Sequence, residues 1–419
     1  MIFFFIVFVI IAYRICSLKN GSYKLFNLWL AIFSTYFIFT LISHSYIEDP
    51  YRDYFISVDQ LFFYSNAISL SNLSYGSIFE YCFNTFKYSD TPLSIAIFAS
   101  IAKIGKSIGV TDILLLEKFN IVFLGSLIPI YIYKIVLLKT KDYAGLRKQI
   151  FMFAFLSPIL ILSAQMLRDI HVCFVYTLLL YYSLKDKSRL RWLYLIGLIL
   201  IAYFLRRENG LFAILFLIIP LWNVYNKSNI YTKILLLFTL VIILVLNFGF
   251  VVGINEVMND TISSYTERSI SHADSSSLGV KLNNFPFPVN YILKATFAQF
   301  LPFPIWLPFT NEAPYVYIRI VECFFPFYWI AILWSIIKYI KLIYKRFDKI
   351  LFVVFVIAVL YLVLCSASEF GTRRLLAVFP VLFSIFLIIY KPLNISVRKS
   401  LNFSIPLIIF LHLVYLFIK

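Results

Sequence analysis

Residues 43–64, SHSYIEDPYRDYFISVDQLFFY, follow an apolar run at residues 25–42 that has the length and composition of a membrane span. They gather Glu48, Asp49, Arg52, Asp53 and Asp59 into one short segment. Proline disfavours helical geometry in the residue before it, so the pair Asp49-Pro50 predicts that the span ends here. The acids are then left at the water boundary.

The residues after this turn carry a helical pattern. Val58, Leu61, Phe62 and Ser65 recur at helical spacing, which predicts a helix that begins at Asp59 and lies along the membrane interface. Such a helix would fix the direction of the Asp59 side chain, whereas Asp49 and Asp53 flank the proline turn, where we expect them to be solvated. We interpret residues 43–64 as an external loop that carries a carboxylate site.

The composition of the whole chain agrees with a membrane protein. Of 419 residues, 62% are hydrophobic and only 14% are charged, and the mean hydropathy is +0.90, whereas soluble domains are roughly 45–50% apolar. The net charge of +17 lies in short Lys/Arg clusters between apolar runs, as the positive-inside rule requires, so nucleic acid is not expected as a partner. The five cysteines show no metal-binding spacing, and the apolar start of the chain is interpreted as a retained first span.

Hydropathy predicts an all-α, polytopic transmembrane helical bundle with external amphipathic helices and one large external loop, forming a single integral membrane domain over residues 1–419. The expected number of spans is about twelve, because a span needs roughly 20 apolar residues and shorter ones are tolerated inside a bundle. The predicted spans are residues 2–13, 25–44, 119–138, 150–166, 170–184, 192–205, 210–224, 234–254, 315–340, 350–365, 375–390 and 401–418.

Residues 92–109, PLSIAIFASIAKIGKSIG, also resemble a span but contain Lys103 and Lys106. Counting this segment as a span would invert the charge pattern downstream, so it is placed as a re-entrant or interfacial hairpin on the outer side. The external loops are then about residues 45–118 and 255–314.

With this choice the basic clusters fall on one side, predicted to be cytoplasmic. They are found at residues 14–24, 139–148, 185–191, 227–233, 341–349 and 391–399. The other side receives compact groups of mixed charge: the acidic loop, Arg168-Asp169, Arg206-Arg207-Glu208 and Glu369 with Arg373-Arg374.

These outer groups suggest one chemistry. A carboxylate can deprotonate a hydroxyl group while arginines hold a phosphate leaving group, which is what glycosyl transfer from a lipid phosphate requires. The candidate catalytic residues are Asp59, Asp169 and Glu369, with Asp59 preferred as the base. The candidate phosphate-binding residues are Arg168, Arg206, Arg207, Arg373 and Arg374. The alternatives left open are lipid-headgroup contacts for the arginines and a solvated loop acid for Asp59.

Other residues carry weaker signals. His44 is expected to cap the second span, and His171 and His412 are expected to be satisfied buried histidines. The external loop at residues 255–314 contains several prolines that forbid one continuous helix, and its rings suit an interfacial belt or a sugar-stacking platform. No HExxH, GxSxG, Walker A or strand-linked GxGxxG motif is present, which argues against nucleotide-driven cytosolic chemistry.

Several of these segments, taken in order, resemble a known family. RDYFISVDQLFFY, TPLSIAIFASIAKIGKSIG, SPILILSAQMLRD and RRENG, within residues 43–220, are similar in order and hydropathy to GT-C membrane glycosyltransferases that use polyprenyl-linked donors. Those enzymes often carry Asp-Asp or Asp-Glu where this chain has Asp59-Gln60. The resemblance implies no cofactor and leaves dependence on a divalent metal open; no metal-binding residue is assigned.

The aromatic and lysine-rich composition, the large external loop and the outer arginines also resemble Wzy-type O-antigen polymerases. This resemblance implies a multi-pass protein of the bacterial inner membrane that joins lipid-linked repeat units on the outer face. Asp59 then matches the acid position, and Arg168, Arg207 and Arg373 match the arginine positions by role. The implied partners are undecaprenyl-(pyro)phosphate-linked saccharides and membrane lipids, with a chain-length regulator as an optional partner.

Two other functions remain open. One is a GT-C transferase that adds a single sugar from a polyprenyl phosphate; the other is a polysaccharide flippase or another transporter. A transporter favours helices broken by Gly or Pro and charges at the bilayer midplane. Gly totals only 12, which argues against a transporter. Arg319 and Glu322 lie inside a predicted span, however, and so favour one.

The predicted topology can be tested by cysteine labelling. Because the basic clusters mark the cytoplasmic side, cysteines substituted for Ser45 and Ser276 should react with a membrane-impermeant maleimide in intact spheroplasts. A cysteine substituted for Ser396, in a basic connection, is the control and should react only after lysis. Reaction of either outer position solely after lysis would overturn this topology.

Overall fold

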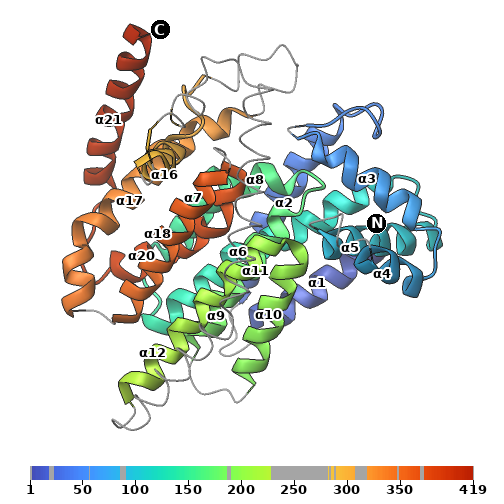
Figure 1. Ribbon diagram of the computed structural model, residues 1–419, viewed down its shortest axis with the longest axis horizontal. Coiled ribbons are helices and arrows are strands. Elements are labelled where there is room, and N and C mark those ends of the chain that lie inside the picture. The colour runs from blue at the N-terminus through green and yellow to red at the C-terminus, as the bar shows by residue number, and fades with distance from the viewer. Residues whose placement is uncertain are drawn as a thin grey trace.

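The computed structural model describes residues 2–17, 23–55, 57–84, 91–185, 190–227, 282, 285–286, 289–306, 319–346, 349–368 and 372–418. These residues form helices joined by short connections, and no strand occurs among them (Figure 1). The first half contains α1 (Ile2–Ser17), α2 (Tyr23–His44), α3 (Asp59–Leu70), α4 (Tyr75–Asn84), α5 (Pro92–Ser107), α6 (Ile113–Lys139), α7 (Leu146–Leu156), α8 (Pro158–Ser163) and α9 (Asp169–Leu184).

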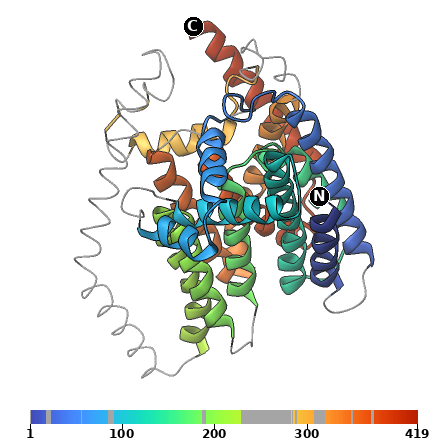
Figure 2. The ribbon, with the colours of Figure 1, turned by 90° about the vertical axis from the view of Figure 1, so that its right-hand side faces the viewer.

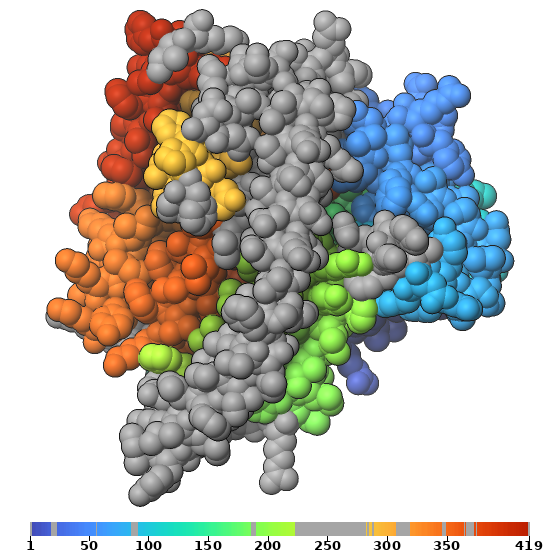
Figure 3. All heavy atoms as spheres, in the orientation of Figure 1, coloured from blue at the N-terminus to red at the C-terminus, as the bar shows by residue number. Residues whose placement is uncertain are grey.

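The second half continues the helical pattern with α10 (Arg191–Leu205), α11 (Arg207–Ile214), η2 (Leu215–Leu217), α12 (Ile218–Lys227), α16 (Val289–Phe297) and η3 (Ala298–Phe300). It ends with α17 (Ile320–Arg346), α18 (Lys349–Ser368), α19 (Thr372–Leu375), η6 (Leu376–Val378), α20 (Phe379–Tyr390) and α21 (Val397–Ile418). In the space-filling view, α3 to α5 in blue and α17 in orange lie on opposite flanks of the molecule (Figure 3).

Helix α6 is the central helix, because it packs against α2, α9 and α20 and most of its side chains are buried. Side chains in a bilayer gain little from leaving lipid, so close packing and buried hydrogen bonds must hold such helices together. The indole of Trp29 in α2 donates to Ser126 Oγ in α6 at 3.0 Å, and Tyr36 OH donates to the Ala154 carbonyl in α7 at 2.8 Å. Gly125 of α6 lies so close to Ser163 of α8 that a Cβ would overlap its hydroxyl group.

Four helices are long and apolar enough to cross a membrane: Tyr23–His44, Ile113–Lys139, Ile320–Lys345 and Val397–Phe417. Shorter apolar helices lie at Ile2–Ser17, Asp169–Leu184, Arg191–Leu205, Lys349–Val363 and Leu376–Tyr390. A 16-residue helix is roughly 24 Å long, which is less than the hydrocarbon thickness of about 30 Å. The described residues therefore form a helical protein with four candidate membrane spans, and the count of about twelve stays a prediction. The predicted span at residues 234–254 lies outside the described residues.

One predicted span is divided in the structure. Residues 150–166 were expected to form a single helix, but α7 ends at Leu156 and Ser157 is extended, with ψ 156°. The cause is Pro158, which disfavours helical geometry at Ser157 and then begins α8. The chain leaves α8 at Ser163 and runs without regular structure to α9. This division places Asp169 at the start of a new helix.

Helix α5 differs from the long helices in direction: Figure 2 shows it lying crosswise to α2 and α6. Its two lysines contact the C-terminal end of α3. Lys106 Nζ donates to the Ile68 carbonyl at 3.3 Å and to Asn72 Oδ1 at 3.1 Å, and Lys103 Nζ lies 3.5 Å from the Ser71 carbonyl. The partial negative charge of a helix C-terminus favours cations there. The lysines that made this segment ambiguous in the sequence therefore attach α5 to α3.

The acidic loop folds back on itself before α3. Asp53 Oδ2 accepts hydrogen bonds from the backbone N–H groups of Glu48 and Asp49, and Asp49 Oδ1 accepts one from Tyr51. Helix α3 begins at Asp59, as the sequence predicted. Of the four residues at helical spacing, Val58 and Phe62 are 59% and 50% exposed, Ser65 is exposed and Leu61 is half-buried. The opposite face of α3, from Gln60 to Leu70, packs on α5.

Contacts between distant segments show which helix ends lie together. His44 Nε2 at the end of α2 lies 2.8 Å from Asp112 Oδ2, just before α6. At the opposite end of the bundle, Lys134 of α6 donates to the Ile15 carbonyl in α1, and Tyr143 OH donates to the Leu387 carbonyl in α20 at 3.0 Å. The C-terminal ends of α1, α6 and α20 thus lie at one end of the bundle, and the acidic loop lies at the other.

The close approach of α6 and α8 gives a stability prediction. Gly125→Ala should lower the free energy of unfolding by about 1–3 kcal/mol, because overpacking forces the neighbouring helices apart. Gly197→Ala is the matched control, since a Cβ at Gly197 would meet no atom within 4 Å. Thermal unfolding of the purified variants in detergent would measure both. Equal midpoints for the two variants would contradict this packing, and Ser163→Gly should restore part of the loss at Gly125.

Candidate functional site

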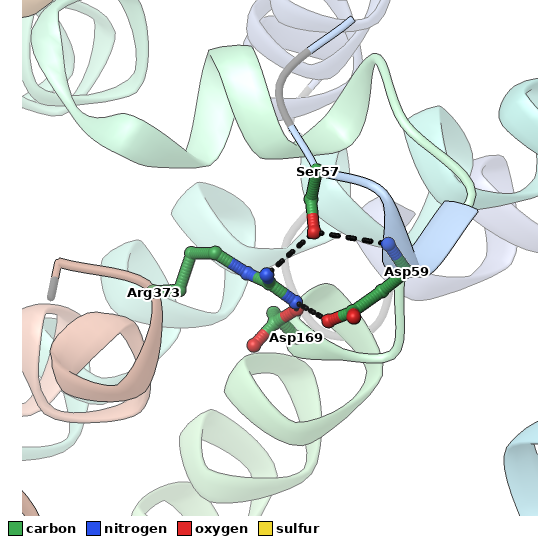
Figure 4. Close-up of polar contacts among 4 residues, drawn as sticks. All are labelled: Ser57, Asp59, Asp169 and Arg373. Atoms are coloured by element: carbon green, nitrogen blue, oxygen red, sulfur yellow. Dashed lines mark hydrogen bonds and ion pairs between the residues drawn. The ribbon is translucent and has the colours of Figure 1, made fainter. Parts of the chain in front are cut away.

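Three segments that are far apart in the chain meet at the guanidinium group of Arg373 (Figure 4). Arg373 Nη2 lies 2.8 Å from Asp59 Oδ2 and 3.0 Å from Asp169 Oδ2, and Nη1 donates to Ser57 Oγ at 2.7 Å. Ser57 and Asp59 come from the start of α3, Asp169 from the start of α9 and Arg373 from α19. We call these four residues the Arg373 cluster.

The two carboxylates of the cluster differ in exposure. Asp59 is the first residue of α3, and its backbone N–H lies 3.3 Å from Ser57 Oγ. Its side chain is 49% exposed, whereas that of Asp169 is only 8% exposed. Both acids occupy helix N-termini, where the partial positive charge of the helix favours a carboxylate. A solute can therefore reach Asp59, whereas Asp169 is a buried partner of Arg373.

Two further arginines lie near the buried acid. Arg206, in the extended connection between α10 and α11, contacts Glu208 Oε2 through Nε at 3.1 Å, and its side chain is only 8% exposed. Arg206 and Arg168 both lie within electrostatic range of Asp169. The α11 segment is fixed by Asn209, whose carbonyl accepts from Tyr176 OH at 2.7 Å and whose Oδ1 accepts from Tyr361 OH at 3.1 Å.

The electrostatics keep Arg373 charged. Burial disfavours a guanidinium ion, but Asp169 and Asp59 outweigh this cost and raise the pKa of Arg373 above its ordinary value. Its Nε is buried and has no hydrogen-bond partner in the part of the chain that the structure describes. Arg373 thus has an N–H donor that neither acid uses, and such a donor could bind a phosphate oxygen.

The structure brings some of the predicted site residues together and leaves others outside the described part of the chain. The structure brings Asp59, Asp169 and Arg373 together and places Arg168 and Arg206 beside them. Arg207 begins α11 and is half-buried. Glu369 lies outside the described residues, and so does the side chain of Arg374, whose backbone belongs to α19.

Other candidate residues are explained by local contacts. His44 ends α2 as predicted and pairs with Asp112, which also caps α6 by accepting from the Leu115 N–H. Burial alone would raise the pKa of Asp112, but these two hydrogen bonds lower it below the ordinary value. His412 is a satisfied buried histidine as predicted, because its Nε2 accepts from the Ile305 N–H at 2.8 Å. His171 is buried as predicted, and its ring lies against the Leu167 backbone.

Arg319 and Glu322, the charges that favoured a transporter, form a pair at the start of α17. Arg319 Nη2 lies 2.7 Å from Glu322 Oε2, and Nε lies 2.9 Å from the same oxygen. Their position at the first turn of a 27-residue helix places them at its end and not at its centre.

Sequence reasoning assigned no role in the site to three polar residues of the segments that carry Asp59 and Asp169. Ser57 binds Arg373, Gln60 is fully buried on the inner face of α3, and His171 is buried two residues after Asp169. Gln60 had a signal, because it occupies the place of a second acid in the Asp59-Gln60 pair. Among the described residues, no group of three or more His, Cys, Asp and Glu side chains is arranged to hold a metal ion.

Comparisons of the chain with known protein families, with curated proteins and with solved structures gave no match.

The cluster predicts a specific pattern of stability changes. Arg373→Met should lower the free energy of unfolding by about 3–5 kcal/mol, because it leaves the buried Asp169 carboxylate without its counterion. Asp59→Asn should cost less than Arg373→Met, since Asp59 is half-exposed. Adding Asp169→Asn to Arg373→Met should recover part of the loss, because the uncompensated charge is then removed. Chemical denaturation of purified protein would measure these differences, and additive losses in the double variant would contradict the pairing.

Proposed function

We propose that this protein is a membrane glycosyltransferase that acts on polyprenyl-linked sugars. The observation that carries the proposal is the convergence of Asp59, Asp169 and Arg373 from three separate connections onto one ion cluster. A structural ion pair needs only two partners, and a headgroup contact needs an arginine directed toward lipid. Here the Arg373 side chain is only 24% exposed and contacts two carboxylates, one of which, Asp59, is half-exposed.

The geometry supports a division of labour between these residues. Asp59 would take the proton from an acceptor hydroxyl, whose oxygen attacks the anomeric carbon of the donor sugar. The bond between that carbon and the lipid phosphate oxygen breaks, and the phosphate leaves with the electron pair. Arg373 would hold the phosphate through the donors that its acids do not use, with Arg168 and Arg206 adding positive charge. Asp169 would fix the orientation of Arg373.

The wider proposal follows the sequence resemblances. The chain would cross the bacterial inner membrane about twelve times, with several short spans inside the bundle, and the Arg373 cluster would face outward. The reaction would join undecaprenyl-(pyro)phosphate-linked repeat units of O-antigen or a similar surface polysaccharide. A GT-C transferase that adds one sugar would use the same residues, and the two are distinguished by product length. A transporter is the weaker alternative here, because Arg319 and Glu322 pair with each other at the start of α17.

Asp59→Asn should nearly abolish sugar transfer while membrane abundance is preserved. The substitution is nearly isosteric, and losing a positioned base typically costs 10²–10⁴-fold in rate. The assay is extension of lipid-linked acceptor in membranes, with the amount of the protein measured in the same samples. Asp53→Asn is the matched control, because Asp53 only organises the preceding loop.

The result would contradict this role for Asp59 if the variant kept more than about a tenth of the activity, well above the roughly one per cent left by the weakest typical base. Asp169 and Glu369 would then be the next candidates.

Arg373→Lys retains the charge but loses the planar fork, so its transfer rate should also fall well below that of the wild type.

A further inference from the structure

At the end of the bundle opposite the acidic loop, two lysines lie against tyrosine rings. Lys134 Nζ of α6 is 5.3 Å from the centre of the Tyr131 ring. Lys185 follows α9 directly, and its Nζ is 5.3 Å from the centre of the Tyr181 ring and 5.8 Å from that of Tyr182. All five residues are half-buried. We call them the lysine–tyrosine cluster.

The tyrosine rings join the two lysines across α6 and α9. Tyr131 of α6 meets Tyr181 of α9 edge-on at 5.5 Å, and the rings of Tyr181 and Tyr182 meet at 5.2 Å. Lys134 and Lys185 lie within electrostatic range of each other. The packing of α6 on α9 therefore places two positive charges near one another on one group of rings.

The two charges of the cluster are not balanced by an acid among the described residues. The ion pairs in that part of the chain lie elsewhere, and none includes Lys134 or Lys185. Lys134 instead donates to the Ile15 carbonyl near the end of α1. A ring face attracts an ammonium group but carries no net charge that would cancel it. An anion between the two lysines would remove their mutual repulsion.

Aromatic residues beside the cluster indicate its depth in the bilayer. Tyr182 stacks on Tyr194 in the first turn of α10 at 4.8 Å. Trp192 lies in the same turn, and the guanidinium carbon of Arg191 is 5.4 Å from the centre of its ring. Tyrosine and tryptophan are enriched where the apolar part of a membrane meets water. The two lysines are therefore at the level of the lipid headgroups.

An exposed apolar face continues from the cluster along α10, which runs beside α9 (Figure 1). Leu193, Ile196 and Leu200 recur at helical spacing, and each is more than half exposed. They lie on the face of α10 opposite the buried Leu195 and Leu198. In a bilayer such a face contacts acyl chains. The surface thus matches a molecule that has a phosphate at the lysines and apolar chains along α10.

We propose that the lysine–tyrosine cluster binds the headgroup phosphate of an anionic phospholipid, in the leaflet on the side of the basic connections. The phosphate lies between Lys134 and Lys185, and the acyl chains follow the exposed face of α10. Basic sites between membrane helices on the cytoplasmic side suit anionic headgroups. A zwitterionic lipid fits less well, because its own cation meets the two lysines. The site is at the opposite end of the bundle from the acidic loop, and it does not depend on the proposed function.

The test compares three phosphate compounds on the purified protein in a neutral detergent. They are phosphatidylglycerol, phosphatidylethanolamine and soluble glycerol phosphate, each at the same concentration. A ligand that binds the folded state raises the midpoint of thermal unfolding. Phosphatidylglycerol should raise it more than phosphatidylethanolamine does, and glycerol phosphate, which has the charge without acyl chains, should leave it unchanged.

Two results with the wild type would overturn the proposal. Equal shifts with the two lipids would show that the charge of the headgroup is not recognised. A shift with glycerol phosphate as large as that with phosphatidylglycerol would show a site for soluble anions and not for a membrane lipid.

Lys134→Met and Lys185→Met should each weaken the apparent affinity for phosphatidylglycerol about fivefold, the factor that one lysine near an anionic membrane surface contributes. Lys185→Met leaves the contact between Lys134 and α1 intact, so its effect is separate from any loss of that packing. Lys134→Arg and Lys185→Arg retain the charge and should keep the preference for phosphatidylglycerol. Unchanged affinity in both methionine variants would contradict the site.

Lys338→Met is the matched control. Lys338 also lies over a tyrosine ring, that of Tyr339 at 5.6 Å, but it belongs to α17. This variant should keep the wild-type affinity for phosphatidylglycerol. An equal loss in Lys338→Met and in the two cluster variants would show diffuse attraction by the net positive charge of the chain, and the proposed site would be wrong.

Discussion

A guanidinium group held between two carboxylates is the constraint that orders the acidic end of this protein. Removing a charge from water is costly, and the cost is recovered only when the counterions are placed with good geometry. Arg373 meets Asp59 and Asp169 within 3.0 Å, so α3, α9 and α19 must be positioned relative to one another before any of them is stable there. The rest of the bundle supplies this positioning through α6, which packs against α2, α9 and α20. The ion cluster and the central helix are thus two parts of one arrangement.

Each charged residue of the site occurs where a helix begins or is interrupted. Ser157-Pro158 divides α7 from α8, and α9 then begins at Asp169. The extended Arg206 separates α10 from α11. Interruptions of this kind are tolerated at membrane depth only where the protein satisfies the freed backbone groups. Each interruption begins a new helix, and the partial positive charge at the N-termini of α3 and α9 favours the carboxylates of Asp59 and Asp169. The interruptions therefore place Asp59, Asp169 and Arg373 at helix ends, where their side chains meet.

The sequence could predict the local features but not the pairings. Apolar runs, proline positions and charge clusters are local properties, and in the described residues they correctly indicated helices long and apolar enough to cross a membrane and the start of α3 at Asp59. The contacts of Arg373 join residues that are 314 and 204 positions apart, so nothing local specifies that this arginine binds both acids. The division of residues 150–166 was missed because the apolar composition continues through Ser157-Pro158.

The buried polar groups of this protein follow two different patterns. Away from the cluster they find partners: Trp29 pairs with Ser126, Gln299 pairs with Trp329 and His412 accepts from Ile305. From α3 to the start of α9, several side chains in the described residues have none, including Gln60, Ser94, Lys118 and Gln165. Leaving a buried polar group unsatisfied costs about 1–3 kcal/mol, and an apolar residue of similar shape would avoid that cost. The chain accepts this cost along the stretch from α3 to the start of α9, which contains the segments that carry both Asp59 and Asp169.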